Sequence, residues 1–214
     1  MARVLHIQAS PMQQLSFSRR VAEAFLERYR RDHPGDEVRT VDLAKERLPA
    51  FDFPMASAKY KILHGRPPSK EEARVWKAVE EMIARFKEAD KLVVSSPMWN
   101  FGIPYALKQY LDVIVQPTYT FSYSPEEGYK GLVTGRPALL ILARGGSYGP
   151  GSGAGAGAEA MDFQRPYLEA ILRFMGFAAI ETLLVEPTLG GGPKAAEETL
   201  KKAIAEAEKK AEKF

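Results

Sequence analysis

The sequence has no cysteine among its 214 residues. This absence excludes disulfide bridges, thiolate nucleophiles and zinc sites built on cysteine ligands. Histidine is scarce as well, because only His6, His33 and His64 are present and they are dispersed along the chain. We therefore expect no metal site and no histidine-based catalytic triad, and we expect His6 to be structural because it lies inside a predicted strand.

Long hydrophobic runs are also lacking. The apolar run near the N-terminus is shorter than the roughly 7–15 residues of a signal peptide's apolar region. No stretch approaches the roughly 18–20 apolar residues of a membrane-spanning helix. We therefore expect a cytoplasmic protein without a membrane partner.

No charge of one sign dominates the chain. Thirty basic residues face 27 acidic ones, which gives a net charge of +3. The longest basic runs are pairs such as Arg30-Arg31 on predicted helices, and such pairs are typical of solvated helix faces. The small surplus favours anionic small ligands and does not indicate a nucleic-acid partner.

Short apolar runs alternate with segments whose apolar residues recur at helical spacing. The predicted strands are residues 4–9, 37–42, 91–96, 138–143 and 180–185. The predicted helices are residues 18–31, 69–89, 105–115, 163–175 and 194–213. This alternation predicts an α/β fold, a doubly wound five-stranded parallel sheet with helices on both faces. The length fits a single domain over residues 1–214.

Three segments interrupt this pattern. Residues 47–68 form a polar, proline-containing insertion (Arg47 to Pro68) of undetermined role, residues 116–135 are rich in Tyr, Thr and Phe, and residues 145–157 are rich in glycine. Long loops in compact domains are usually functional or disordered. Residues 149–157 fit a flexible linker equally well. The match to G-x-G-x-x-[GA] at 151–156 is interpreted as accidental, because it lies inside a Gly/Ala tract away from a strand end.

Ligands of doubly wound sheets bind beyond the carboxyl ends of the strands, so the loops after the strands carry the functional information. Ser10 follows the first strand, and Ser16-Phe17-Ser18 opens the next helix. Hydroxyls and free amides at a helix N-terminus form an anion site that suits a phosphate. The alternative is an ordinary helix cap with a loop serine.

The third strand ends in Pro97-Met98-Trp99-Asn100-Phe101. Aromatic side chains at a strand's carboxyl end suit a flat heterocycle, and prolines fix the backbone that would face the ring edge. The alternative is an aromatic core cluster with Asn100 in a turn. A core cluster is a poor explanation, because Trp and Phe beside Pro and Gly make an unfavourable core strand.

The fourth strand ends in Ala143-Arg144-Gly145-Gly146. Paired glycines let a ligand approach the backbone closely, although Arg144 is also compatible with a simple surface cation. Together the three loops suit flavin mononucleotide. A single phosphate site without a second glycine fingerprint favours FMN over FAD.

The chain resembles the FMN-dependent NADH-azoreductases, also classed as NAD(P)H:quinone oxidoreductases, within the flavodoxin-like superfamily. The residues that carry the resemblance are Ser10 with 16–18, 97–101 with Ile103-Pro104, 120–123, 131–135, 144–146, 166–168 and 174–177. In this family the serines hold the FMN phosphate, and the stretches at 97–101 and 143–146 hold the isoalloxazine ring. Trp99 stands where some members have tyrosine.

The resemblance implies an enzyme that takes hydride from NADH or NADPH and reduces quinones and aromatic azo compounds by a ping-pong mechanism. The flavin carries the hydride, so no catalytic side chain is expected. We predict a substrate pocket formed by Tyr119, Phe121, Tyr123 and Phe163. The aromatic segment 116–129 has no evident core of its own and indicates an interface, although a β-excursion that packs its aromatic residues on its own domain is the alternative. The family resemblance implies a homodimer with both flavin sites at the interface, and we predict that this segment helps form the substrate pocket partly against the other subunit.

Three other interpretations remain open. A flavodoxin-type electron carrier is usually strongly acidic, which this chain is not. A general NAD(P)H:FMN reductase would use the same flavin loops. A nucleic-acid or protein-binding module on the basic face would leave the three loops unexplained.

Overall fold

The centre of the protein is a parallel sheet, described here from a computed structural model that covers residues 1–149 and 158–214. Its strands are β1 (Arg3–Gln8), β2 (Glu37–Asp42), β3 (Lys91–Pro97), β6 (Pro137–Ala143) and β7 (Ala179–Val185). They lie in the order β2-β1-β3-β6-β7, and every neighbouring pair is parallel. The predicted doubly wound five-stranded sheet is confirmed. The G-x-G-x-x-[GA] match lies outside the described residues.

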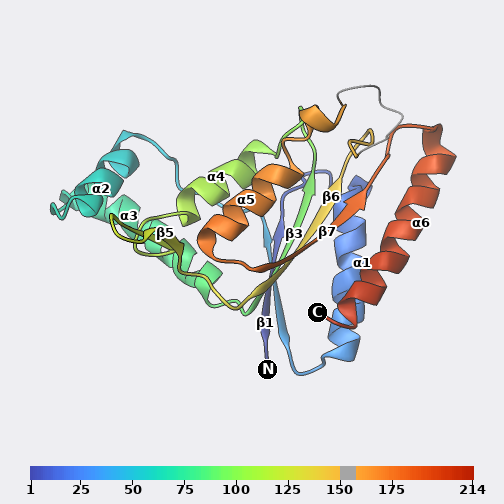
Figure 1. Cartoon of the computed structure of the whole chain (residues 1–214), viewed down its shortest axis with the longest axis horizontal. Coiled ribbons are helices and arrows are strands. Elements are labelled where there is room, and N and C mark those ends of the chain that lie inside the picture. Colours follow the sequence, from blue (N-terminus) through green and yellow to red (C-terminus); the bar gives the residue numbers. More distant parts are fainter. Residues whose placement is uncertain (150–157) are drawn as a thin grey trace.

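Helices cover both faces of the sheet (Figure 1). The helices are α1 (Phe17–Asp32), α2 (Phe53–Leu63), α3 (Lys70–Lys87), α4 (Tyr105–Ile114), α5 (Arg165–Met175) and α6 (Gly192–Ala211). Two 3₁₀ turns, η1 (Gln13–Leu15) and η2 (Ala158–Met161), and a hairpin of β4 (Phe121–Ser124) and β5 (Gly128–Gly131) complete the described elements. Helices α1 and α6 pack on one face, and α3, α4 and α5 pack on the other.

Successive strand residues point to opposite faces, so the sheet supports two hydrophobic cores. Val4 packs with Phe25 of α1 and Leu200 of α6, whereas the next residue, Leu5, belongs to the core under α3 and α4. Strand β6 is buried from Ala138 to its end because both of its faces are covered. This double coverage explains why its sequence is an unbroken apolar run.

Helix α3 begins where its sequence predicts. The side chain of Ser69 accepts a hydrogen bond from the amide of Glu72 (3.3 Å), and the carboxylate of Glu72 accepts one from the amide of Ser69 (2.6 Å). This reciprocal capping box satisfies two amides that the helix itself leaves unpaired.

The insertion at 47–68 contains a helix that the sequence analysis did not predict. Asp52 caps α2 by accepting from the amide of Met55 (3.3 Å), and Lys61 forms an ion pair with Glu72 of α3 (2.7 Å). Phe53 and Tyr60 are apolar but 83% and 61% exposed, so the helix has no polar face opposite a buried apolar stripe. The helix was missed because that two-faced pattern is the sequence signal of a surface helix. The Asp-Phe-Pro start, a cap with proline in the first turn, was the available signal.

Candidate functional site

The strand register brings the functional loops to one edge of the sheet. Pro97 at the end of β3 pairs with Ala143 at the end of β6, which in turn pairs with Val185 at the end of β7. Strand β1 ends beside them, since Gln8 pairs with Ser95. The segments after β1, β3 and β6 therefore meet at the carboxyl edge, as the sequence predicts.

Three buried serines, called here the serine cluster, lie in the segment after β1 and at the start of α1. Ser10, Ser16 and Ser18 are 1%, 6% and 0% exposed. The hydroxyls of Ser16 and Ser18 lie 3.2 Å apart, and Ser16 caps the helix by accepting from the amide of Arg19 (3.3 Å). The first-turn amides of Phe17 and Ser18 have no partner within the helix. Hydroxyls, free amides and the helix dipole together match the donors that a phosphate needs.

The loop after β3 is a tight and strained turn. Trp99 and Gly102 exchange two backbone hydrogen bonds, each 3.0 Å long. Between them Asn100 and Phe101 have φ angles of +47° and +69°, in the left-handed region that a phenylalanine rarely adopts. Such strain costs on the order of 1–3 kcal/mol per residue and concentrates at functional sites. From sequence, a turn at Asn100 was only an alternative, and the left-handed Phe101 was not predicted.

The strained turn displays aromatic rings rather than burying them. Trp99 and Phe101 are 37% and 41% exposed, so the core-cluster alternative does not describe them. The amide of Phe163 donates to the carbonyl of Phe101 (3.0 Å), which brings a third aromatic residue to this edge. Two neighbours were missed from sequence: Tyr105 beside Trp99, and Tyr148 beside Phe101, each with ring centres 6.3 Å apart.

Arg144 follows β6 and was expected from sequence to contact a ligand, but its side chain is buried within the protein. The side chain of Arg144 is only 1% exposed. Its guanidinium lies 2.8 Å from the carboxylate of Asp162 and 3.3 Å from that of Glu186. Gly145 and Gly146, which follow Arg144, are half-buried, so their backbone is accessible to a ligand. Pro97 and Met98 are also half-buried, and the amide of Met98 donates to the carbonyl of Ala143 (2.8 Å).

The predicted substrate-pocket residues are not assembled within one chain. Phe163 precedes α5 at the carboxyl edge, whereas Phe121 packs on Phe174 at the far end of α5, with ring centres 4.7 Å apart. An 11-residue helix is about 16 Å long. Tyr123 lies beside Tyr129 in the same hairpin, and Tyr119 points to α3, where it donates to Glu80 (2.5 Å).

His6 is buried beneath this edge rather than exposed in it. Its Nε2 lies 2.8 Å from the hydroxyl of Ser95 and its Nδ1 lies 3.3 Å from that of Thr40. Burial and the nearby Arg30 and Arg19 lower the pKa of His6 to about 3. The imidazole is therefore neutral at physiological pH, and the predicted structural role agrees with this position.

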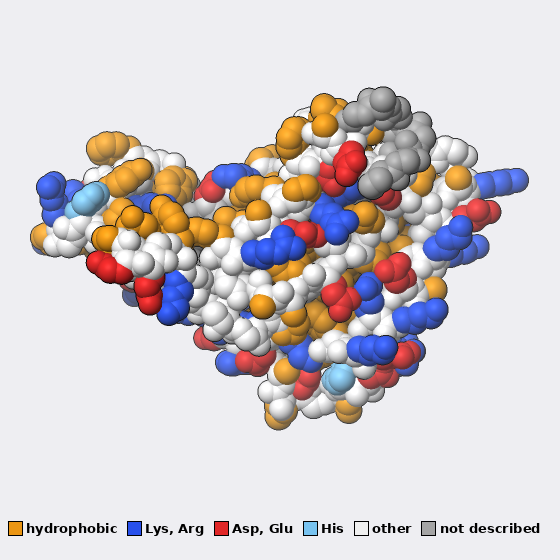
Figure 2. All heavy atoms as spheres, viewed as in Figure 1, with side chains coloured by type: hydrophobic (Ala, Val, Ile, Leu, Met, Phe, Trp, Pro, Cys, Tyr) orange, Lys and Arg blue, Asp and Glu red, His pale blue; other side chains and the backbone are white. Residues whose placement is uncertain are grey.

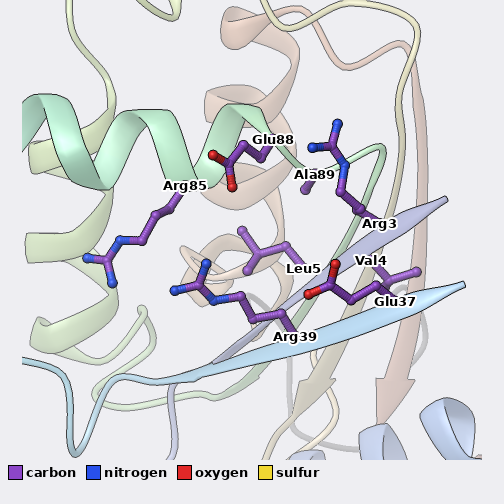
Figure 3. A pocket seen from close by; sticks show the side chains of 8 residues that line it. All are labelled: Arg3, Val4, Leu5, Glu37, Arg39, Arg85, Glu88 and Ala89. Atoms are coloured by element: carbon purple, nitrogen blue, oxygen red, sulfur yellow. The ribbon is translucent and has the colours of Figure 1, made fainter.

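The surface hollows differ in what they can hold. One of about 350 Å³ lies at the carboxyl edge and reaches Ala9, Arg47, Trp99 and Tyr105. A hollow at the amino edge, between Arg3, Arg39 and Arg85 of β1, β2 and α3 (Figure 3), has only about 40 Å³ and admits no more than a few waters. Within the described part of the chain, no group of three or more His, Asp or Glu is placed to hold a metal ion.

Comparison with known proteins agrees with this geometry. A family model described as a flavodoxin-like fold matches residues 2–211. An FMN-dependent NADH:quinone oxidoreductase of Nitratidesulfovibrio vulgaris is 47% identical over 214 residues, the full length of both chains. An azoreductase structure from Bacillus anthracis is 34% identical with a TM-score of 0.88 and full coverage of both chains.

A second Bacillus anthracis structure, an FMN-dependent NADH-azoreductase in complex with FMN, is 29% identical with a TM-score of 0.88, covering 100% of this chain and 99% of that one. The chain therefore belongs to the flavodoxin-like family, together with the FMN-dependent NADH:quinone oxidoreductases that it matches over its whole length.

Proposed function

We propose that this protein is an FMN-dependent NAD(P)H oxidoreductase that reduces quinones and aromatic azo compounds. The observation that carries the proposal is the meeting of a buried serine cluster and a strained aromatic turn at one edge of the sheet. The relatives named as NADH:quinone oxidoreductase and azoreductase supply the donor and acceptor classes.

The described residues fit FMN. Ser10, Ser16 and Ser18 would hold the phosphate, together with the amides of Phe17 and Ser18. The backbone of 97–101 and 143–146 would border the ring system, with Trp99 and Phe101 as its aromatic neighbours. When bound, FMN supplies a ring that accepts hydride from NAD(P)H and passes two electrons to the acceptor.

The protein's own contribution is to position substrates and exclude water. We propose that donor and acceptor enter the same pocket in turn, which is a ping-pong order. The aromatic surface at the strand ends supports this order, because the flat donor and the flat acceptor would compete for it. The backbone of the strained turn is fixed before either substrate binds. Neither binding step therefore has to order this turn, which removes an entropic cost.

A second copy of the chain would complete the pocket. The surface formed by α2 and the β4–β5 hairpin exposes Phe53, Tyr60, Tyr123 and Tyr129 by 61–83%. Figure 2 shows hydrophobic side chains gathered on this projecting part of the molecule. Beside it, Phe51, Lys59, Phe121, Tyr167 and other residues line a groove of about 460 Å³. We propose a homodimer that carries the hairpin of one subunit, with Phe121, to the strand ends of the other.

We further propose that residues 1–214 act as one domain in the cytoplasm. Both cores share one sheet, so neither face is stable without the other. The use of reduced nicotinamide as donor supports the location. Among the described helices, none has the length and apolarity to cross a membrane.

An absorbance spectrum of the purified protein tests the assignment, followed by chromatography of the released flavin. We expect FMN, and FAD as the main species would contradict the proposal. Anaerobic NADH should bleach the flavin spectrum, and a quinone should restore it. An electron carrier would not be bleached by NADH directly, and a general FMN reductase would turn over free FMN faster than quinone.

A further inference from the structure

Arg144 occupies an unusual position for a charged residue at the end of a strand. It is 2% exposed, and its guanidinium has acceptors from three side chains. Nη2 forms an ion pair with Asp162 at 2.8 Å without the angle of a hydrogen bond. Nη1 donates to Glu186 (3.3 Å) and Nε donates to Gln164 (3.1 Å). The planar fork of arginine suits such divergent acceptors, whereas the single ammonium of lysine does not.

Each acceptor is anchored to another part of the carboxyl edge. The second carboxylate oxygen of Asp162 accepts from the amides of Gln164 (3.1 Å) and Arg165 (3.0 Å), where α5 begins. The side-chain amide of Gln164 donates to the carbonyl of Ser96 in β3 (3.3 Å). Glu186 directly follows β7. The guanidinium therefore ties the ends of β3, β6 and β7 to the start of α5.

The backbone of Arg144 belongs to the same network. Its carbonyl accepts from both the amide and the hydroxyl of Thr188, each at 2.9 Å, and its amide donates to Val185 (3.0 Å). Gly145 follows immediately, and its carbonyl accepts from the amide of Leu189 (3.0 Å). The backbone of Arg144 and Gly145 is thus held by the end of β7 and the segment that follows it.

We propose that Arg144 is a positioning residue rather than a ligand of the cofactor, and that Asp162 is its essential partner. Through Asp162 it sets Phe163 against Phe101, since these two share a 3.0 Å backbone hydrogen bond. Through its own backbone it sets Gly145 and Gly146. The inference deepens the proposed function and depends on it only for the identity of the bound ligand.

The test uses Asp162→Asn, Arg144→Lys and the double variant in the full-length protein. FMN affinity is measured by quenching of FMN fluorescence on titration with FMN-free protein. We expect each single variant to weaken FMN binding by about tenfold or more, as loss of an orienting partner does at other sites. The double variant should bind FMN about as tightly as the single variant that binds it more weakly, because both changes break one coupled unit.

Glu169→Gln is the matched control. Glu169 also pairs with two arginines on α5, Arg165 at 2.7 Å and Arg173 at 3.0 Å, and its side chain is 14% exposed, the same as that of Glu186. It lies outside the Arg144 network, so FMN affinity should stay at the parent value.

A second measurement does not depend on FMN. Amide hydrogen exchange of the FMN-free protein should become faster at 98–102 and 144–148 in Asp162→Asn and Arg144→Lys, and stay unchanged there in Glu169→Gln. If Arg144→Lys fails to fold, Glu186→Gln replaces it, because that variant keeps the 2.8 Å pair with Asp162.

Three results would overturn the inference. If Arg144→Lys weakens FMN binding while Asp162→Asn does not, Arg144 contacts the ligand directly. Additive losses in the double variant lead to the same conclusion. Parent-like FMN affinity or parent-like exchange in both single variants would leave Arg144 without a positioning role. A parent protein that binds no FMN would instead refute the proposed function, while the exchange data still decide the role of Arg144.

Discussion

Removing the hydroxyl of Ser18 should weaken FMN binding without unfolding the helix start. Ser18 is 0% exposed, and its hydroxyl contacts only that of Ser16 among the hydrogen-bond partners within the described protein. Ser16 has a second task, because it caps α1 by accepting from the amide of Arg19. Ser18→Ala is therefore the cleaner probe of the phosphate site, and Ser16→Ala adds a loss of capping.

The magnitudes follow from these contacts. A hydrogen bond to a charged group contributes about 1.5–3 kcal/mol, so loss of the Ser18 hydroxyl should raise the FMN dissociation constant by roughly 10- to 150-fold. Ser16→Ala should raise it by a similar factor and should also cost about 1 kcal/mol of stability through the lost cap. Both variants should bind less FMN than the parent protein. The absorbance spectrum of the FMN that stays bound should match that of the parent.

The assay is quenching of FMN fluorescence by FMN-free protein, with thermal unfolding of the same samples. Ser69→Ala is the matched control, because it removes the corresponding cap of α3, a 3.3 Å bond to Glu72, away from the serine cluster. It should lower stability by about 1 kcal/mol and leave FMN affinity unchanged. An unchanged dissociation constant for Ser18→Ala would show that the phosphate binds elsewhere.

Three further outcomes are expected. Light scattering at micromolar concentration should give about twice the chain mass of 23.8 kDa, and a monomer that stays fully active on dilution would refute the shared pocket. Hydrogen bonds from Lys61, Ser57 and Ser69 lower the pKa of Glu72 from 4.5 to about 2. The stabilising contribution of the Glu72 carboxylate is therefore present above pH 4.5 and is lost as the pH falls toward 2. Glu72→Gln should thus destabilise the protein at pH 6 and approach the parent near pH 2 in thermal unfolding, whereas an equal deficit at both pH values would exclude this ion pair as the cause. The NMR shifts of the His6 ring should stay constant from pH 8 to pH 5, because burial lowers its pKa to about 3, and a titration near 6.5 would contradict the buried assignment.

The five-stranded sheet could be predicted from the sequence because the apolar patterns that mark its strands are local and periodic. Strands such as β6 are covered on both faces, so their burial appears directly as unbroken apolar runs. The parallel register then places the loops after Gln8, Pro97 and Ala143 together without any further information. The location of the candidate site could therefore be inferred from the order of the elements alone.

The contacts of single side chains could not be inferred in this way. Arg144 was assigned from sequence to the flavin edge, with a surface cation as the alternative, because its partners Asp162 and Glu186 are distant in the chain and the latter is 42 positions away. The left-handed conformation of Phe101 also carries no sequence signal, whereas Asn100 is of a residue type that is enriched in this region and was considered only as an alternative turn residue. Such strain persists only where the surrounding structure imposes it.

Helix α2 was missed because Phe53 and Tyr60 are exposed. The substrate pocket shared between two subunits stays a prediction, since within one chain Phe121 of the hairpin lies at the far end of α5 from Phe163. Periodicity rules assume that a chain buries its apolar side chains against itself, and they fail where the packing partner is another molecule. The exposed aromatic side chains of α2 and of the β4–β5 hairpin therefore support the proposed dimer, in which a second subunit would cover them.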